Sequence, residues 1–292
     1  LAKVGNKTTI KYSPNGNWAT ANNAVRLVYA DSGAVLHTNT WNFTVNLAGA
    51  SSTQVTGQWD FDFGNLGATV GTALAYFDPT FDGPTGSNPN KTQFGTTTSF
   101  GIADINGQVA NVMEVPGDLS RKIGYVMTHG IAPNGGGTKV NQYTLIMDVF
   151  VDTSGPGAAS WWNVGASLDN TDDGDLFWQG GNFGQGGGGY NGTGQFTAGA
   201  WHRVVAAYDE AANPPVVTKY VDGIKQDDWT ANQALDDPRR AMQPTAILFG
   251  DGDQDERRKM WVNSVQIRAG KLSDAECVLL GGPSGSGIPV VL

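Results

Sequence analysis

Residues 199–226 read GAWHRVVAAYDEAANPPVVTKYVDGIKQ. Apolar residues alternate with other residues from Trp201 to Tyr208, and a second alternating run follows an acidic, proline-containing turn. The pair Asp222-Gly223 interrupts that second run. A tight type I′ turn needs positive φ at both central residues, which Asp-Gly tolerates well. The stretch therefore predicts antiparallel β-hairpin structure.

The composition agrees with a chain of many short strands. The 292 residues include 41 glycines, and only 15% are charged, which indicates tight turns between strands rather than helices. A single large β-sandwich often exceeds roughly 200 residues, so this length allows either one such domain or two domains.

The hairpin stretch also resembles a known family. Its pattern W-H-x-V-x-x-x-Y-D … Y-V-D-G is similar to the signature hairpin of laminin-G-like members of the concanavalin A-like superfamily. The resemblance covers about residues 58–280 and is also strong in VNSVQIRAGKLSDAE at residues 262–276. It implies an all-β fold, a concanavalin A-like antiparallel jelly-roll β-sandwich. Within the second motif, Ser273 with Glu276 three residues later predicts a helix start.

The chain outside residues 58–280 has a different character. Residues 1–46 alternate over strand-like lengths, and AVRLVYADSG … TWNFTV resembles the closing strands of a bacterial immunoglobulin-like module. Because a full sandwich needs about seven strands, we expect a partial immunoglobulin-like β segment here. Residues 47–57 are small and polar, as in a linker. Residues 281–292 form a Gly/Ser/Pro tail that resembles another linker.

Charge and cysteine content narrow the classes of partner. The net charge is −9 with a pI near 4.7, and the basic residues form no stripe, which argues against nucleic acid and anionic lipid. The lone Cys277 permits no internal disulfide. No apolar run is long enough to span a membrane. We expect a bacterial secreted protein, extracellular or at the cell surface, with any signal peptide removed or outside this sequence.

The sequence carries no recognisable catalytic motif. Glycoside hydrolases of this superfamily place Glu-x-Asp-x-x-Glu on one strand, and that motif is absent. Asp148 and Asp152 lie on one predicted strand, whose residues are too apolar to support an acid/base pair. Glu210 lies in a predicted turn, where we expect it to be exposed to solvent. His129 could pair with Tyr190 as a lyase base, but a structural histidine is the simpler interpretation. We assign no catalytic residue.

The resemblance implies a structural calcium ion. In the superfamily, a cation is held between the first strand, a loop and the final strand of the sandwich. Asp62 matches the first-strand position, Asn263 matches the last-strand position, and Asp251 could complete the shell. The alternative is that these acidic residues only favour turns.

Several tryptophans suggest a surface for sugars. Trp162 follows another tryptophan, so the two face opposite sides of a strand and one core can bury only one of them. The same logic applies to Trp178 after Phe177. Exposed indoles beside polar side chains stack on pyranose rings. The predicted ligand-binding residues are Trp162, Asp173, Asp175, Trp178 and Gln179. The alternative is that loops cover both indoles.

These observations favour a non-catalytic binding module, stabilised by Ca²⁺, with a polysaccharide or a surface glycoprotein as its partner. Two alternatives stay open. A structural or adhesive subunit could assemble as a homo-oligomer, because the partial N-terminal segment would expose sheet edges that invite strand exchange. A polysaccharide-degrading hydrolase or lyase could use a motif that we do not recognise.

Overall fold

The structure is a computed structural model with two compact units, Leu1–Ala50 and Ser51–Leu292. It describes all residues except 1, 5–6, 10–21, 32, 45–52, 118–122, 154–158, 161, 164–175, 186–191, 228, 231–233 and 251–257.

The described residues of the first unit form two antiparallel strand pairs. Strand β1 (Ala2–Val4) pairs with β2 (Lys7–Thr9), and β3 (Asn22–Ala30) pairs with β4 (Leu36–Thr44). The β3–β4 turn is held by the Asp31 carboxylate, which accepts the backbone N–H groups of Gly33 and Val35 and contacts the ring of His37 at 2.8 Å. Strands β3 and β4 lie where alternation predicted strands, and the immunoglobulin-like assignment stays a prediction.

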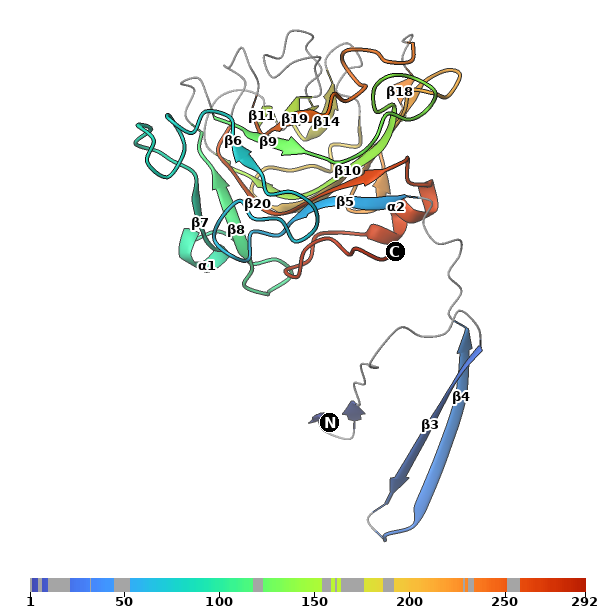
Figure 1. The fold of residues 1–292 in the computed structure, drawn as a ribbon. Helices are drawn as coiled ribbons and strands as arrows, with labels where there is room; N and C mark the ends of the chain where they lie inside the picture. Colours follow the sequence, from blue (N-terminus) through green and yellow to red (C-terminus); the bar gives the residue numbers. More distant parts are fainter. Residues whose placement is uncertain are drawn as a thin grey trace. The chain divides into compact units, whose positions relative to one another are not determined.

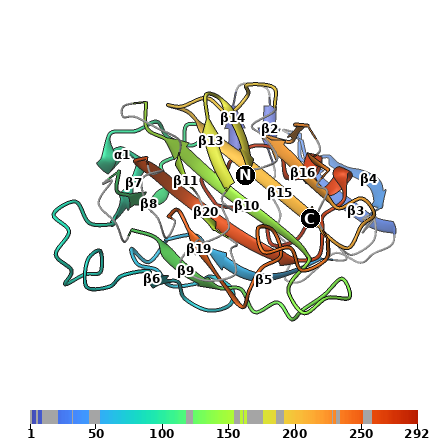
Figure 2. The same ribbon diagram turned by 90° about the horizontal axis from the view of Figure 1, so that it is seen from above.

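The second unit is built on a nine-stranded antiparallel sheet, whose central strands lie side by side in Figure 2. The path β17-β16-β15-β10-β20-β8-β7 forms most of it, with β18 added to β16 and β5 added to β20. Its strands are β5 (Gln54–Trp59), β7 (Gln93–Thr96), β8 (Asn111–Val115), β10 (Gln142–Val151), β15 (Trp201–Asp209), β16 (Val216–Val221), β17 (Ile224–Lys225), β18 (Trp229–Thr230) and β20 (Met260–Ala269).

Two smaller sheets face this large one (Figure 1). One has the order β12-β19-β9-β6 and the other has the order β11-β13-β14. Their strands are β6 (Ala75–Tyr76), β9 (Tyr125–Thr128), β11 (Ala159–Ser160), β12 (Trp162–Asn163), β13 (Leu176–Gln179), β14 (Asn182–Gln185) and β19 (Thr245–Leu248). The main core joins the layers, for example Leu145 of β10 and Val204 of β15 with Met127 of β9 and Leu248 of β19. The predicted all-β sandwich is confirmed.

The hairpin predicted from residues 199–226 forms as expected. Strands β15 and β16 pair from Asp209–Val216 to Val204–Val221, and β16 returns through Asp222 and Gly223 to β17. Both turn residues have positive φ, 52° and 76°, which is the backbone that a type I′ turn requires.

The described part of the chain contains two short helices. Helix α2 (Asp274–Leu280) starts at the predicted N-cap Ser273, whose hydroxyl accepts the N–H of Glu276 while the Glu276 side chain returns to the Ser273 backbone. Helix α1 (Thr97–Phe100) was not expected from the sequence, although Thr96 and Ser99 form the same kind of capping box. A single turn lacks the apolar periodicity that sequence patterns detect.

Two of the expected boundaries are wrong. The linker assigned to residues 47–57 overlaps β5, which starts at Gln54 and pairs with β20. The tail 281–292 is also no free linker: Ile288 is only 2% exposed and packs with Leu272, Cys277 and Leu280 outside the large sheet. The composition of the tail suggests a linker, but buried side chains of the sheet donate hydrogen bonds to the carbonyls of Gly287 and Ile288.

Within the described part of the chain, no helix has the length and apolar character needed to cross a membrane.

Candidate functional site

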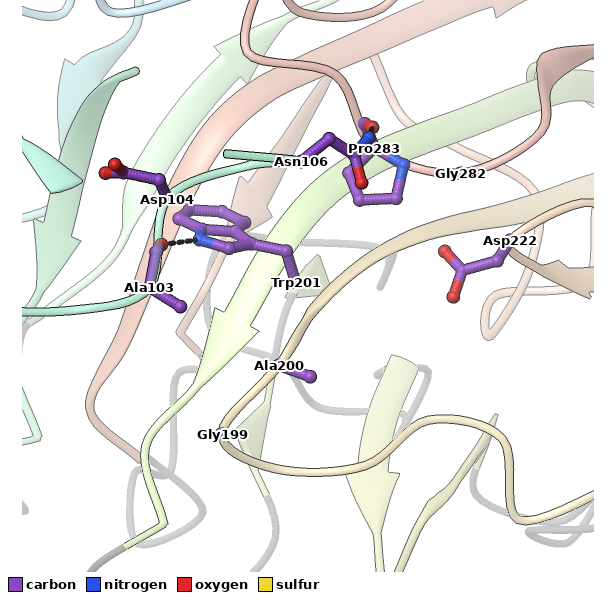
Figure 3. A pocket seen from close by; sticks show the side chains of 9 residues that line it. All are labelled: Ala103, Asp104, Asn106, Gly199, Ala200, Trp201, Asp222, Gly282 and Pro283. Atoms are coloured by element: carbon purple, nitrogen blue, oxygen red, sulfur yellow. Dashed lines mark hydrogen bonds between the residues drawn. The ribbon is translucent and has the colours of Figure 1, made fainter. Parts of the chain in front are cut away.

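An open cleft of about 430 Å³ lies where four segments of the second unit meet. Figure 3 shows Trp201, at the start of β15, beside the loop that follows α1 and beneath Asn106 and Pro283, with Asp222 across the cleft. The lining residues are Ala103, Asp104, Asn106, Gly199, Ala200, Trp201, Asp222, Gly282 and Pro283.

The Trp201 side of the cleft is fixed by hydrogen bonds between segments. The Trp201 indole N–H donates to the carbonyl of Ala103 at 2.7 Å, and its ring packs on Phe150 at 5.7 Å between centroids. The Asn106 amide donates to the carbonyl of Pro283 at 2.8 Å. The Asp104 carboxylate accepts the Thr97 hydroxyl at 2.5 Å. These bonds hold the loop of residues 103–106 against β15 and the C-terminal segment.

The opposite side of the cleft is formed by Asp222. One carboxylate oxygen accepts the backbone N–H of Arg203 at 2.8 Å, and the other lies 2.7 Å from Nδ1 of His202. The Nε2 of His202 lies 3.2 Å from the Thr197 hydroxyl. Asp222 has a positive φ of 52°, and its carboxylate lies against the neighbouring strand β15. The carboxylate is therefore oriented from two directions, which is how sites fix polar groups for recognition.

The cleft offers oriented acceptors together with small apolar surfaces. Asp104, Asn106 and Asp222 bring carboxylate and amide groups, while Ala200 and Pro283 bring apolar surface. Trp201 is largely buried, so its ring forms part of the wall and does not present a full face. Such a mixture can hydrogen-bond ligand hydroxyls while covering C–H surface.

The predicted calcium ligands Asp62 and Asn263 are brought together by a third residue, Asn111. The Asn111 amide donates to the exposed carboxylate of Asp62 at 3.0 Å, and the Asn263 amide donates to the carbonyl of Asn111 at 2.8 Å. The Asn263 side-chain oxygen is buried and has no hydrogen-bond partner among the described residues. An oxygen left over in this way fits a Ca²⁺ ligand, because Ca²⁺ prefers carboxylate and amide oxygens.

The calcium shell is not complete within the described residues. Asp251 lies outside them. The residues that the structure describes contain no group of three or more His, Cys, Asp or Glu side chains that could hold a metal ion. Among the described residues, Asp62, Asn263 and backbone carbonyls would supply the ligands to such an ion.

The predicted sugar-stacking residues are only partly visible. Trp178 is 8% exposed, its N–H donates to the carbonyl of Phe196 at 2.7 Å, and the Arg258 guanidinium lies over its ring at 4.8 Å. The expectation that Trp178 is exposed is wrong, because it joins the core between the sheets. Asp173, Asp175 and the side chains of Trp162 and Gln179 lie outside the described residues.

Two other sequence expectations can be compared with the structure. His129 is a structural histidine, as expected: Nε2 lies 2.5 Å from the carbonyl of Gln243, Nδ1 accepts the N–H of Ile131, and burial lowers its pKa. Tyr190 lies outside the described residues. Glu210 was expected to be solvated, and this is wrong, since it is 2% exposed and burial raises its pKa to about 7.

Neither Asn111 nor the cleft residues were found from the sequence. Asn111 follows a loop and carries no motif. From the sequence, Asp222 was identified only as a turn residue. Its partner His202 lies twenty positions earlier, on the strand that pairs with β16. Only the β15–β16 register could have suggested that contact, because it places Val204 opposite Val221 next to the turn.

No protein-family model matches the sequence, and no curated protein matches it. Solved structures match this chain only at low similarity. Domain 4 of AbnA, a GH43 extracellular arabinanase from Geobacillus stearothermophilus in complex with arabinotriose, is 13% identical with a TM-score of 0.48, over 78% of this chain and 98% of that domain.

The botulinum neurotoxin type G receptor binding domain is 10% identical with a TM-score of 0.48, over 77% of this chain and 50% of that chain. The CBM40 of a Ruminococcus gnavus IT-sialidase, bound to α2,3-sialyllactose, is 13% identical with a TM-score of 0.38, over 49% and 84% of the two chains. Likenesses at this level carry no information about the ligand of this chain.

Proposed function

We propose that this chain is an extracellular β-sandwich module that binds neutral glycans in the Trp201 cleft and is stabilised by Ca²⁺ at Asp62 and Asn263. The observation that carries the glycan proposal is the cleft itself, where fixed carboxylate and amide groups surround small apolar surfaces.

The polar groups of the cleft suit a hydroxyl-rich ligand. Asp222 is held by Arg203 and His202, and Asn106 is held by Pro283, so their orientation is set before a ligand arrives. Preorganised groups lose little conformational entropy on binding. Saccharide hydroxyls are donors that carboxylate oxygens accept strongly.

The charge of the cleft points to neutral rather than anionic sugars. Its described lining carries two carboxylates, Asp104 and Asp222, and no lysine or arginine. The whole chain has a net charge of −9. A uronate or a sialic acid would meet repulsion here with no cation to offset it.

The calcium part of the proposal rests on Asn263. Its buried, unpartnered oxygen is an acceptor that ordinary packing leaves unsatisfied. Such an atom destabilises a fold by roughly 1–3 kcal/mol unless a ligand satisfies it. Ca²⁺ at this position would join a residue after the first strand of the unit, Asp62, to its last strand.

The glycan proposal is tested with Asp104→Asn and Asp222→Asn in affinity electrophoresis against neutral and anionic polysaccharides. We expect the wild type to bind at least one neutral polysaccharide, and each variant to bind it roughly ten-fold or more weakly, because each loses a charged acceptor. Asp227→Asn is the matched control, since Asp227 is exposed and outside the cleft. Equal retention of all four proteins on every neutral polysaccharide bound would contradict the cleft assignment.

A further inference from the structure

The C-terminal segment 281–292 lies along a row of buried polar side chains on the outer face of the large sheet, away from the two smaller sheets (Figure 1). The row runs across neighbouring strands. It consists of Asp148, Arg203, Asp60, Gln58, Gln266 and Arg268. We refer to it as the polar groove.

The polar groove holds the segment mainly through backbone carbonyls. Arg203 donates to the carbonyl of Gly287 at 3.1 Å, and Gln58 donates to that of Ile288 at 3.0 Å. Arg268 donates to the carbonyls of Pro289 and Val290 at 3.0 and 2.9 Å. Side chains of the sheet thus hold the four consecutive carbonyls of residues 287 to 290.

Two residues of the segment add selectivity. Ile288 is buried against Leu272, Cys277 and Leu280. Gly287 has a φ of 79°, and a Cβ there would lie 2.6 Å from a carboxylate oxygen of Asp60. The groove therefore selects a glycine followed by an apolar side chain, and the exposed Val291 beyond them is not selected.

The groove keeps internal partners that do not depend on the segment. Both carboxylate oxygens of Asp148 accept Arg203 at 2.7 Å, and Arg268 also donates to Gln266. Ser264 donates to Asp60 at 2.6 Å. Departure of the segment would leave the Asp148–Arg203 ion pair in place. Water could replace the carbonyls that Arg268 loses, so release is less costly than breaking an ion pair.

We propose that the polar groove is a peptide-binding site that takes a Gly-Ile-Pro segment, filled here by residues 281–292 of the same chain, and that the same segment of a second copy can fill it. Residues 281–286 connect α2 to the bound carbonyls and are rich in glycine and serine, which suits such an exchange.

The test uses the full chain with Ile288→Asp, whose own segment cannot place a carboxylate in the apolar pocket. A fluorescent synthetic peptide of residues 281–292 is titrated into this variant and into the wild type. We expect saturable binding to the variant and at least ten-fold weaker binding to the wild type, in which the groove is already filled. The same peptide with Ile288→Asp should not bind, and the peptide with Val291→Asp should bind like the natural one.

A folded variant, judged by near-ultraviolet circular dichroism, that binds no peptide would overturn the proposal. Equal binding of the natural and Ile288→Asp peptides would overturn it too. A second measurement needs no variant: hydrogen exchange of the Ile288 amide in the wild type should be at least ten-fold faster than that of the β10 amides. If the Ile288 amide and the β10 amides exchange at the same rate, the segment leaves the groove only when the whole unit unfolds. That result would contradict the proposal that the segment binds as a separate ligand.

Discussion

Glu210 shows how a single residue departs from what its sequence context suggests. It directly follows β15 in a segment of turn-forming residues, yet its backbone N–H donates to Asn141 and its side chain is buried. Neither carboxylate oxygen has a hydrogen-bond partner among the described residues, and burial raises its pKa to about 7 although the nearby Arg240 charge lowers it. A carboxyl group in this setting is neutral in mildly acidic solution and costs stability once it ionises.

Glu210 should therefore make folding stability fall with rising pH. In the unfolded chain the carboxyl ionises near 4.5, so its contribution is complete below that pH and is lost as the pH rises through about 7. The loss amounts to about 3 kcal/mol. In urea unfolding at several pH values, Glu210→Gln should lack this loss, while the exposed Asp227→Asn should behave as wild type. If the free energy of unfolding changes with pH equally in the wild type and in Glu210→Gln, Glu210 is not the source of the pH dependence.

At the scale of elements, β10 and β15 are buried on both faces. Their inner side chains face the smaller sheets, and their outer side chains lie under α2, the loop after α1 and the C-terminal segment. The outer face still carries the ion pair of Asp148 and Arg203, with Nε and Nη2 of Arg203 each 2.7 Å from a carboxylate oxygen. Burial raises the pKa of Asp148 although Arg203 opposes the shift. Arg203 also donates to the carbonyls of Leu280 and Gly287, so the pair is linked to the segments that cover this face.

Removing one partner of this pair should be much more harmful than removing both. Arg203→Met should lower the free energy of unfolding by about 3–5 kcal/mol, because Asp148 then stays buried without a counter-charge. The double variant with Asp148→Leu should recover much of that loss. The control is Lys225→Met, which breaks an exposed pair with Asp274 and should cost less than about 1 kcal/mol. Chemical denaturation measures all three, and equal losses for Arg203→Met and Lys225→Met would refute the argument.

At the scale of the whole molecule, the second unit closes by pairing its first strand with its last long strand. Strand β5 lies beside β20 from Gln54–Ala269 to Trp59–Val265. Asp62 follows β5, and Asn263 lies in β20, with Asn111 between them. An ion that joins these positions would stabilise the second unit against global unfolding rather than order one loop, because it would hold together segments that are distant in sequence.

We therefore expect calcium to stabilise the entire second unit. At a free calcium concentration of about one hundred times Kd, linkage gives roughly 2.7 kcal/mol, seen as a rise in Tm by calorimetry after chelation and re-addition. Asp62→Asn and Asn263→Ala should each remove most of this rise, and Asp227→Asn should keep it. A calcium effect that survives both substitutions would place the ion elsewhere.

The sequence by itself determined the features that depend on near neighbours. Alternation predicted the strands, Asp222-Gly223 predicted a turn because few residues adopt two successive positive φ values, and Ser273 with Glu276 predicted a helix start because the capping bonds are local. Only the tertiary structure decided the cleft, the burial of Trp178 and Glu210, and the docking of residues 281–292. Each of these depends on which distant segment covers a residue, and neither periodicity nor composition encodes that contact.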